Sequence, residues 1–333
     1  MGILAGLLNG IFLLPMRYAR RWAWENVWLF FTILSTMVFP WVAAFVTVPH
    51  LLHAFRSVSF FDLVPGMVAG CVWGIAQVMY GLGCGMVGIA IGSAVIGCTA
   101  IISGTLGPLI VYAPSKLFSS ESLILLIATL LIIAGIYMYG KAGASKERET
   151  AGADVKQIVS GSFRMGLTIC LVCGVLGTAF IYGGKSSAGL LAAAKAAGTP
   201  PLFVFYLAYV VTFNAGAVPG ILYSLYKLQH NRTGSNFYTS GAFLWNLSLA
   251  IVMGLLWYCA LLLYGMASEE MGKLGASVAF ALFSSGTVLF ANLFGWLAGE
   301  WNGASRQTIR GFIKGMVFIV SAIFIITFGM HSP

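Results

Sequence analysis

The sequence predicts an all-α integral membrane protein with ten transmembrane helices, arranged as two inverted five-helix repeats. Hydrophobic residues make up 59% of the 333 residues and charged residues only 8%, which is more apolar surface than one soluble core can bury. Ten apolar runs are counted as crossings of about 30 Å of hydrocarbon, the first of them, 2–16, being short, and lipid requires such segments to be helical. One pattern of Gly, Trp and Tyr also occurs twice, half a chain apart, as expected of an internal repeat.

The ten runs divide into two sets of five. Residues 1–140 hold the first repeat, 163–333 hold the second, and we interpret the polar stretch 141–162 as a cytoplasmic connecting loop. The expected spans are 2–16, 27–48, 64–84, 86–112 and 122–140, then 163–183, 201–226, 241–266, 273–297 and 311–330. We expect a kink at Pro40, inside the second run, because proline cannot donate the helical hydrogen bond. Gly83, Cys84 and Gly85 are expected to form a tight turn between the third and fourth spans.

The repeated pattern is G-x2-W-x6-Y-G-x6-G. A shift of 184 positions places Gly70, Trp73, Tyr80, Gly81 and Gly88 on Gly254, Trp257, Tyr264, Gly265 and Gly272. Five spans is an odd number, so the second repeat must cross the membrane in the opposite direction to the first. Secondary transporters built in this way hold their substrate near the midplane, between the repeats. The repeat therefore predicts a transporter in which Trp73 and Trp257 face a shared cavity.

Lys and Arg are concentrated in alternate connections between the spans. The odd-numbered connections hold 13 of the 18 basic residues and the even-numbered ones hold 5. Cytoplasmic loops carry the excess of Lys and Arg, so we expect the odd connections in the cytoplasm and both termini outside. The net charge of +9 is then a topology signal, because no basic helix face or block suggests binding to nucleic acid.

Enzyme chemistry has no signature in the sequence. The four His residues are not placed next to carboxylates in metal-ligand spacing, and no nucleophile elbow, Walker loop or HExxH helix occurs. All six Cys lie within apolar runs, where Cys is a common small hydrophobic residue. We therefore expect no enzyme activity, no metal and no cofactor.

Polar side chains inside apolar helices are costly, and they mark candidate binding residues. Amides together with aromatic rings suit a small neutral sugar, because an amide pairs with adjacent hydroxyls and a ring covers the apolar face of the sugar. For each amide the alternative is a hydrogen bond between helices, and for each ring it is packing. The candidate substrate-binding residues are Asn9, Trp73, Gln77, Tyr80, Asn214, Asn246, Trp257 and Tyr264.

Carboxylates occur only near the ends of the spans. Glu25 and Glu300 have aromatic neighbours, Trp24 and Trp301, which could exclude water from a carboxyl group that carries a proton. We treat these two as candidates for proton coupling. The alternative is structural pairing with nearby arginines, and coupling to sodium instead of protons is also open.

Four motifs follow one another in a fixed order. They are Pro15-Met16-Arg17 before Trp22-Ala23-Trp24-Glu25, then Gly88-Ile89-Ala90-Ile91-Gly92, Gly254-Leu255-Leu256-Trp257-Tyr258 and Gly299-Glu300-Trp301-Asn302. Together they resemble the L-rhamnose-proton symporter family of the drug/metabolite transporter superfamily, over the whole chain.

The resemblance implies that this multi-pass protein lies in the bacterial inner (plasma) membrane, where the Lys and Arg distribution predicts periplasmic termini. It also implies import of a small neutral sugar, L-rhamnose or a related deoxyhexose, by proton symport and alternating access. The cavity would be formed mainly by the first, third and fourth helices of each repeat. The alternative is a drug or metabolite exporter of the same superfamily, which the lack of a mid-span carboxylate disfavours for cationic compounds.

Overall fold

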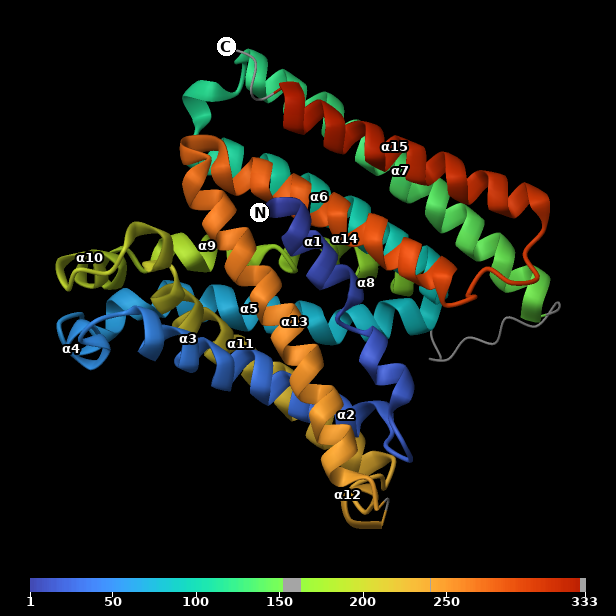
Figure 1. The fold of residues 1–333 in the computed structure, drawn as a ribbon, viewed down its shortest axis with the longest axis horizontal. Coiled ribbons are helices and arrows are strands. Elements are labelled where there is room, and N and C mark those ends of the chain that lie inside the picture. The colour runs from blue at the N-terminus through green and yellow to red at the C-terminus, as the bar shows by residue number, and fades with distance from the viewer. Residues whose placement is uncertain (152–162, 240, 330–333) are drawn as a thin grey trace. The chain divides into compact units, whose positions relative to one another are not determined.

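The computed structural model describes residues 1–151, 163–239 and 241–329, and every regular element in them is helical (Figure 1). Among these residues, nine helical spans are long and apolar enough to cross a membrane, and a shorter apolar helical segment covers Gly2–Tyr18. The prediction of a multi-pass helical membrane protein is confirmed.

The helices follow the predicted spans closely, with several short helices added in the connections. They are α1 (Gly2–Ile11), α2 (Trp24–Thr32), α3 (Phe39–Thr47), α4 (Leu51–Arg56), α5 (Phe60–Val87), α6 (Ile89–Tyr112), α7 (Ser120–Ala151), α8 (Phe163–Leu176), α9 (Ala179–Ser186), α10 (Ala188–Ala196), α11 (Tyr206–His230), α12 (Asn236–Thr239), α13 (Phe243–Glu270), α14 (Gly275–Leu297) and α15 (Arg306–Gly329). A π-helical segment, η2 (Ile33–Val38), joins α2 to α3.

Two boundaries differ from the sequence-based expectation. Helix α7 continues to Ala151, so the first part of the expected 141–162 loop is helical, and the rest of that loop lies outside the described residues. Helix α5 runs without a break through residues 83–85, and the chain turns at Gly88 instead, where φ is +94°. A side chain there would be strained, whereas glycine adopts this conformation readily.

The helices that carry the repeated motif end in the same way. Helices α5 and α13 are both 28 residues long. The chain turns just after each of them at a glycine with positive φ, which is +94° at Gly88 and +64° at its repeat partner Gly272. The sequence correspondence therefore extends to backbone conformation at its last position.

Two compact units are built from segments of both halves of the chain. The first unit contains Met1–Gly10, Met79–Thr178 and the chain from Ala267 onward, and the second contains Ile11–Val78 and Ala179–Met266. In the first unit α7 lies alongside α15 (Figure 1). They pack closely at Gly135 and Gly315, where a Cβ on either glycine would lie 2.8 Å from the carbonyl oxygen of the other. Small residues allow this close packing of membrane helices.

Glu149 fastens the end of α7 to the start of α15. Its carboxylate accepts hydrogen bonds of 2.7 Å from the Ser305 backbone N–H and from the hydroxyls of Ser305 and Thr308. These bonds, with that of the Ser305 N–H foremost, hold the pKa of the Glu149 carboxyl below its ordinary value. An acidic group at a helix N-terminus also interacts favourably with the helix dipole. The polar connection is thus anchored to the membrane helices at its N-terminal end.

In the second unit α11 packs against α2, η2, α3, α9 and α10. Its crossing with α5 is very tight, because a Cβ at Gly70 would lie within 2.8 Å of the Thr212 carbonyl carbon and one at Gly74 would lie 3.0 Å from that of Gly216. Trp73 and Gln77 lie on the same stretch of α5. The close packing of α5 on α11 therefore fixes where Trp73 and Gln77 lie along α11.

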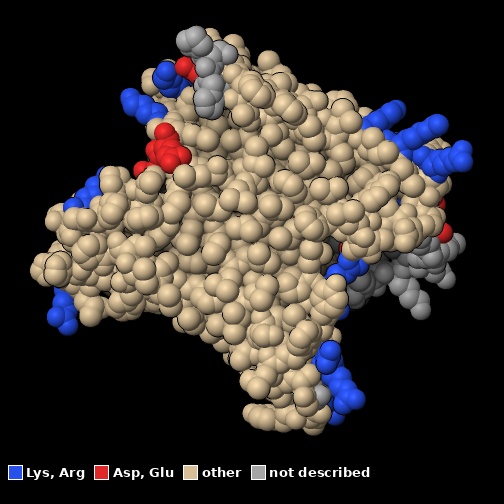
Figure 2. Space-filling model, viewed as in Figure 1, with Lys and Arg blue, Asp and Glu red and all other residues tan. Residues whose placement is uncertain are grey.

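The surface supports a membrane location. Figure 2 shows a face on which charged side chains are confined to a few separate groups, with uncharged surface between them. Exposed large hydrophobic residues occur on most of the long helices, including Leu126 and Leu130 on α7 and Val317 and Phe324 on α15. Such a surface is stable against lipid and unstable in water.

Candidate functional site

A small pocket lies inside the second unit, with a cavity volume of about 40 Å3. It is enclosed by α2, η2, α5, α11, α13 and the segment that follows α1. The lining residues are Phe12, Trp28, Phe31, Thr32, Ser35, Thr36, Trp73, Gln77, Gly216, Gly220 and Trp257. On α11 the two lining positions are glycines, so the pocket extends up to the helix backbone.

Aromatic rings form most of the wall. The two repeat-related indoles of Trp73 and Trp257 contact each other, with ring centroids 5.6 Å apart, and Phe213 backs both rings at 5.4 Å. Trp28 contacts Phe31 at 4.9 Å. Both motif tryptophans thus line the same pocket. Flat indole faces of this kind cover the apolar C–H face of a ring-shaped ligand.

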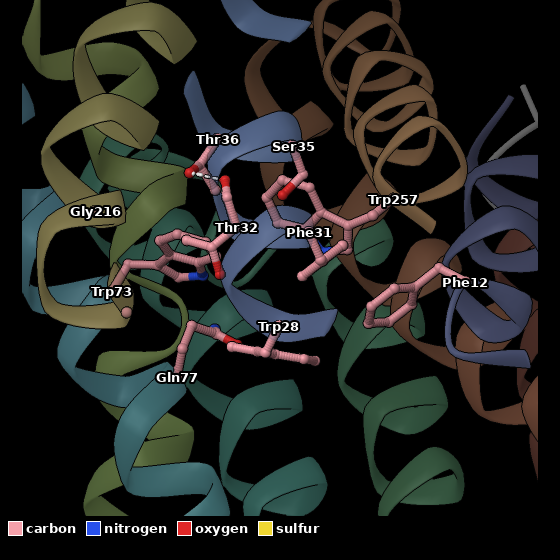
Figure 3. A pocket seen from close by; sticks show the side chains of 11 residues that line it. Phe12, Trp28, Phe31, Thr32, Ser35, Thr36, Trp73, Gln77, Gly216 and Trp257 are labelled. Atoms are coloured by element: carbon pink, nitrogen blue, oxygen red, sulfur yellow. Dashed lines mark hydrogen bonds between the residues drawn. The ribbon is translucent and has the colours of Figure 1, made fainter. Parts of the chain in front are cut away.

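Polar groups are gathered on the remaining wall. Figure 3 shows Thr32, Ser35 and Thr36 above the pocket and the Gln77 amide below them, next to Trp28. The Thr36 hydroxyl donates a 2.6 Å hydrogen bond to the Thr32 carbonyl. The Ser35 hydroxyl is fully buried, and it has no hydrogen-bond partner among the described residues. A buried hydroxyl without a partner costs about 1 to 3 kcal/mol, and a ligand hydroxyl in the pocket would relieve that cost.

The π-helical segment presents Ser35 and Thr36 to the pocket. Pro40 has no N–H to offer the Thr36 carbonyl, and the Asn214 side chain supplies a donor instead, with 3.3 Å between Nδ2 and that carbonyl oxygen. The Asn214 amide oxygen in turn accepts from the Trp41 indole N–H at 3.3 Å. Asn214 therefore lies behind the pocket wall and braces it. The π-helix ends just before Pro40, and such segments often occur at functional sites.

Three of the eight predicted substrate-binding residues line the pocket: Trp73, Gln77 and Trp257. Asn246 is fully buried and pairs with the Arg20 backbone, accepting from its N–H and donating to its carbonyl, both at 2.9 Å. Tyr264 is buried in the same unit against Phe180, with ring centroids 5.8 Å apart.

The other two predicted binding residues belong to the first unit. Asn9 donates to the Thr287 hydroxyl at 3.1 Å, and Tyr80 is 43% exposed.

Sequence reasoning missed Trp28, Thr32 and Ser35. Their spacing was visible in the predicted second span, because residues 28, 32 and 35 fall on one face of a helix. Serine and threonine attract little notice in an apolar segment, where they commonly bond to the carbonyl one turn back. Ser35 does not form such a bond, and only the structure shows that its hydroxyl has no partner within the described part of the chain.

The two candidate carboxylates have different surroundings. Glu25 is 4% exposed, and its Oε1 accepts from Asn231 Nδ2 at 2.9 Å and from the Thr233 hydroxyl at 2.6 Å. This links the start of α2 to the loop after α11. Glu300 is exposed, at the end of α14, with its carboxylate folded back over Gly295. Glu25 alone has the low solvent access that the aromatic neighbours suggested for both.

Comparison with known proteins agrees with the family resemblance. The sequence profile of the L-rhamnose-proton symport protein (RhaT) family matches residues 2–332. The chain is similar to the L-rhamnose-proton symporters of Escherichia coli O1:K1 / APEC and of Shigella dysenteriae serotype 1 (strain Sd197). It is 26% identical to each over 327 residues, covering 96% of this chain and 94% of each relative. The chain therefore belongs to the L-rhamnose-proton symport family, which makes it a transporter of the proton-coupled sugar symport class and not an enzyme.

Proposed function

We propose that this protein imports L-rhamnose or a related deoxyhexose together with a proton across a bacterial inner membrane. The observation that carries the proposal is the unpaired, fully buried Ser35 hydroxyl, which lies in a pocket walled by the Trp73 and Trp257 indoles. The identity of the sugar is taken from the names of the relatives, and the chemistry of the pocket is compatible with it. A 6-deoxyhexose has one methyl-bearing apolar face for the indoles and several hydroxyls for Ser35 and Gln77.

Transport requires the pocket to change size. A cavity of about 40 Å3 holds a few water molecules but not a pyranose ring. The described conformation is therefore a closed one, and sugar entry needs movement of the helices around the pocket. The π-helix η2 is the natural place for that movement, since its hydrogen bonding is already irregular. Alternating access would widen the pocket toward one side of the membrane at a time.

We further propose that residues 1–140 and 163–333 are inverted repeats, with the connection in 141–162 on the cytoplasmic side. The equal lengths of α5 and α13, the positive-φ glycines after both and the shared pocket of Trp73 and Trp257 support this arrangement.

The excess of basic residues in odd-numbered connections supports a periplasmic location for both termini. A reporter fused after Pro333 should therefore give a periplasmic signal, and one fused within the 141–156 connection a cytoplasmic signal. A cytoplasmic signal from the C-terminal fusion would overturn the orientation.

Substitutions in the pocket should weaken sugar binding without unfolding the protein. Ser35→Ala or Gln77→Ala should leave a sugar hydroxyl unpaired, which costs about 1 to 3 kcal/mol, or roughly 5-fold to 150-fold in affinity. Trp73→Leu and Trp257→Leu should also weaken binding, because the sugar ring loses its cover. The measurement is binding and counterflow of labelled L-rhamnose in proteoliposomes, compared with a panel of hexoses, pentoses and deoxyhexoses.

A matched control is Ser285→Ala. Ser285 is also fully buried, but it belongs to the first unit and its hydroxyl donates to the Ala281 carbonyl at 2.6 Å. This variant should bind the sugar as the wild type does. If all four pocket variants fold and bind normally, the pocket only packs helices and the proposed site is wrong. If the wild type shows no counterflow of any sugar in the panel, the proposed substrate class is rejected.

A further inference from the structure

The pocket face of α2 continues past the pocket to the start of the helix. Trp28 lines the pocket, and Trp24 lies one turn before it on the same face. The two indoles stack, with centroids 4.9 Å apart and an interplanar angle of 20°. Trp24 is 39% exposed, whereas Trp73 in the pocket is buried. The Trp24 ring is therefore accessible from outside the protein.

The pocket face of α11 continues toward the same end. Gly216 and Gly220 line the pocket, and at 100° per residue Tyr223 and Lys227 fall on the same side of the helix. The exposed Leu222, 62% accessible, falls on the opposite side. Tyr223 meets Trp24 edge to face at 6.4 Å. The bonds from Asn231 and Thr233 to Glu25 hold these two helix ends together.

Aromatic rings therefore lead stepwise from the pocket to the end of the α2–α11 pair. Trp28 forms the inner step, and Trp24 with Tyr223 forms the outer one. Tyr223 carries a hydroxyl at the edge of its ring, and Lys227 falls on the same side of α11 one turn further on. An exposed aromatic face with polar groups at its edge is the arrangement that binds a sugar ring weakly, by stacking plus hydrogen bonds. A membrane-interface anchor would need exposed rings but would not need them on the pocket face.

We propose that Trp24 and Tyr223 form a second, outer sugar-binding site, which the sugar occupies on its way between the pocket and the α2–α11 end of the protein. The inference rests on the proposed function for the class of ligand. The outer site binds a pyranose more weakly than the pocket, because it is open on one side and has fewer polar groups. Its role is to speed passage without changing the equilibrium affinity of the pocket.

Saturation-transfer NMR with L-rhamnose on the purified full-length protein tests the outer site directly. In Ser35→Ala/Gln77→Ala protein, whose pocket is weakened, transfer to the sugar should persist. It should fall about 2- to 10-fold when Trp24→Ala or Tyr223→Ala is added, and Trp24→Phe should largely restore it. Transfer that does not respond to either substitution would overturn the outer site.

Kinetics separate the outer site from a structural role. With the pocket intact, Trp24→Ala should slow association of labelled sugar while leaving its equilibrium dissociation constant unchanged. If the equilibrium affinity falls by the same factor as the association rate, Trp24 only supports Trp28, and the proposal is rejected. Tyr137→Ala is the matched control, because Tyr137 is a 65% exposed ring on α7, in the first unit. If Tyr137→Ala has the same effect as Tyr223→Ala, these rings are interface anchors.

These outcomes are distinct from failure of the proposed function itself. If wild-type protein neither binds nor exchanges any sugar in the panel, the proposed function fails and the outer site with it. If the wild type binds through Ser35 and Gln77 but no transfer depends on Trp24 or Tyr223, only the outer site is rejected.

Discussion

Gly70→Ala should strongly destabilise the protein and disrupt its pocket, because the added methyl group has no space. A Cβ at this position would overlap the Thr212 carbonyl oxygen and lie 2.8 Å from its carbon. Those atoms belong to the backbone of α11, so no side-chain rotation can relieve the overlap. Overpacking usually costs about 1 to 3 kcal/mol, and a backbone overlap should reach or exceed the upper end of that range.

The same substitution should also weaken sugar binding. Relief of the overlap requires α5 to move away from α11, and Trp73 and Gln77 move with α5. Displacement of about 1 Å is enough to impair a positioned site severely. The measurements are the melting temperature in detergent and the affinity for L-rhamnose. Gly74→Ala should act in the same direction, since its Cβ would lie 3.0 Å from the Gly216 carbonyl carbon.

Gly81→Ala is the matched control for this prediction. Gly81 is on the same helix, and a Cβ there would meet nothing within 4 Å. Alanine has a higher helix propensity than glycine by about 1 kcal/mol, so Gly81→Ala should be neutral or slightly stabilising. If Gly70→Ala melts at the same temperature as Gly81→Ala, the close crossing of α5 and α11 is not a determinant of stability.

The membrane helices were largely predictable because lipid imposes simple rules. Length, hydropathy and the scarcity of charge locate nearly every span to within a few residues. The exceptions are local. The turn after α5 is at Gly88 and not at Gly83–Gly85, since several glycines permit a turn and packing decides which one adopts it. Helix α7 extends into the polar connection because Glu149 bonds Ser305 and Thr308, residues far away in the sequence.

The residues that line the pocket were only partly predictable, for a related reason. Trp73 and Trp257 were found through the repeat, which is a property of the sequence. Amides at membrane depth could be located, but their partners could not be assigned, because an amide N–H can donate either to a sugar hydroxyl or to a backbone carbonyl. Gln77 lines the pocket. Asn246 instead forms hydrogen bonds with the Arg20 backbone, and Asn214 donates one to the Thr36 carbonyl. Only the tertiary arrangement separates these outcomes.

Glu25→Gln should abolish accumulation of the sugar while leaving its exchange intact, if Glu25 carries the coupled proton. Both hydrogen bonds that Glu25 receives end on Oε1, from Asn231 at 2.9 Å and from Thr233 at 2.6 Å. A glutamine keeps an oxygen at this position, so the link between α2 and the loop after α11 should survive. What glutamine loses is the ability to bind and release a proton, which symport requires of some group in the cycle.

The measurements are counterflow without a gradient and uptake driven by an imposed pH gradient, in the same proteoliposomes. Glu25→Gln should give near wild-type counterflow and no accumulation above equilibrium. Glu25→Ala should lose both activities and expression, because it removes the acceptor of both hydrogen bonds that link the start of α2 to the loop after α11. Glu270→Gln is the control, since Glu270 is an exposed carboxylate at the end of α13, and it should accumulate sugar normally.

The opposite results would assign the coupling elsewhere. Normal accumulation by Glu25→Gln would leave Glu25 with a purely structural role and make the exposed Glu300 the next residue to test. Sugar uptake by the wild type that does not alkalinise the medium would point to sodium coupling or facilitated diffusion, and both glutamates would leave the mechanism. Glu25 is the stronger candidate of the two because a proton carrier must exchange its proton in a controlled way. A carboxylate that is 4% exposed can do so only when the helices around it move, which ties proton release to the same motion that opens the pocket.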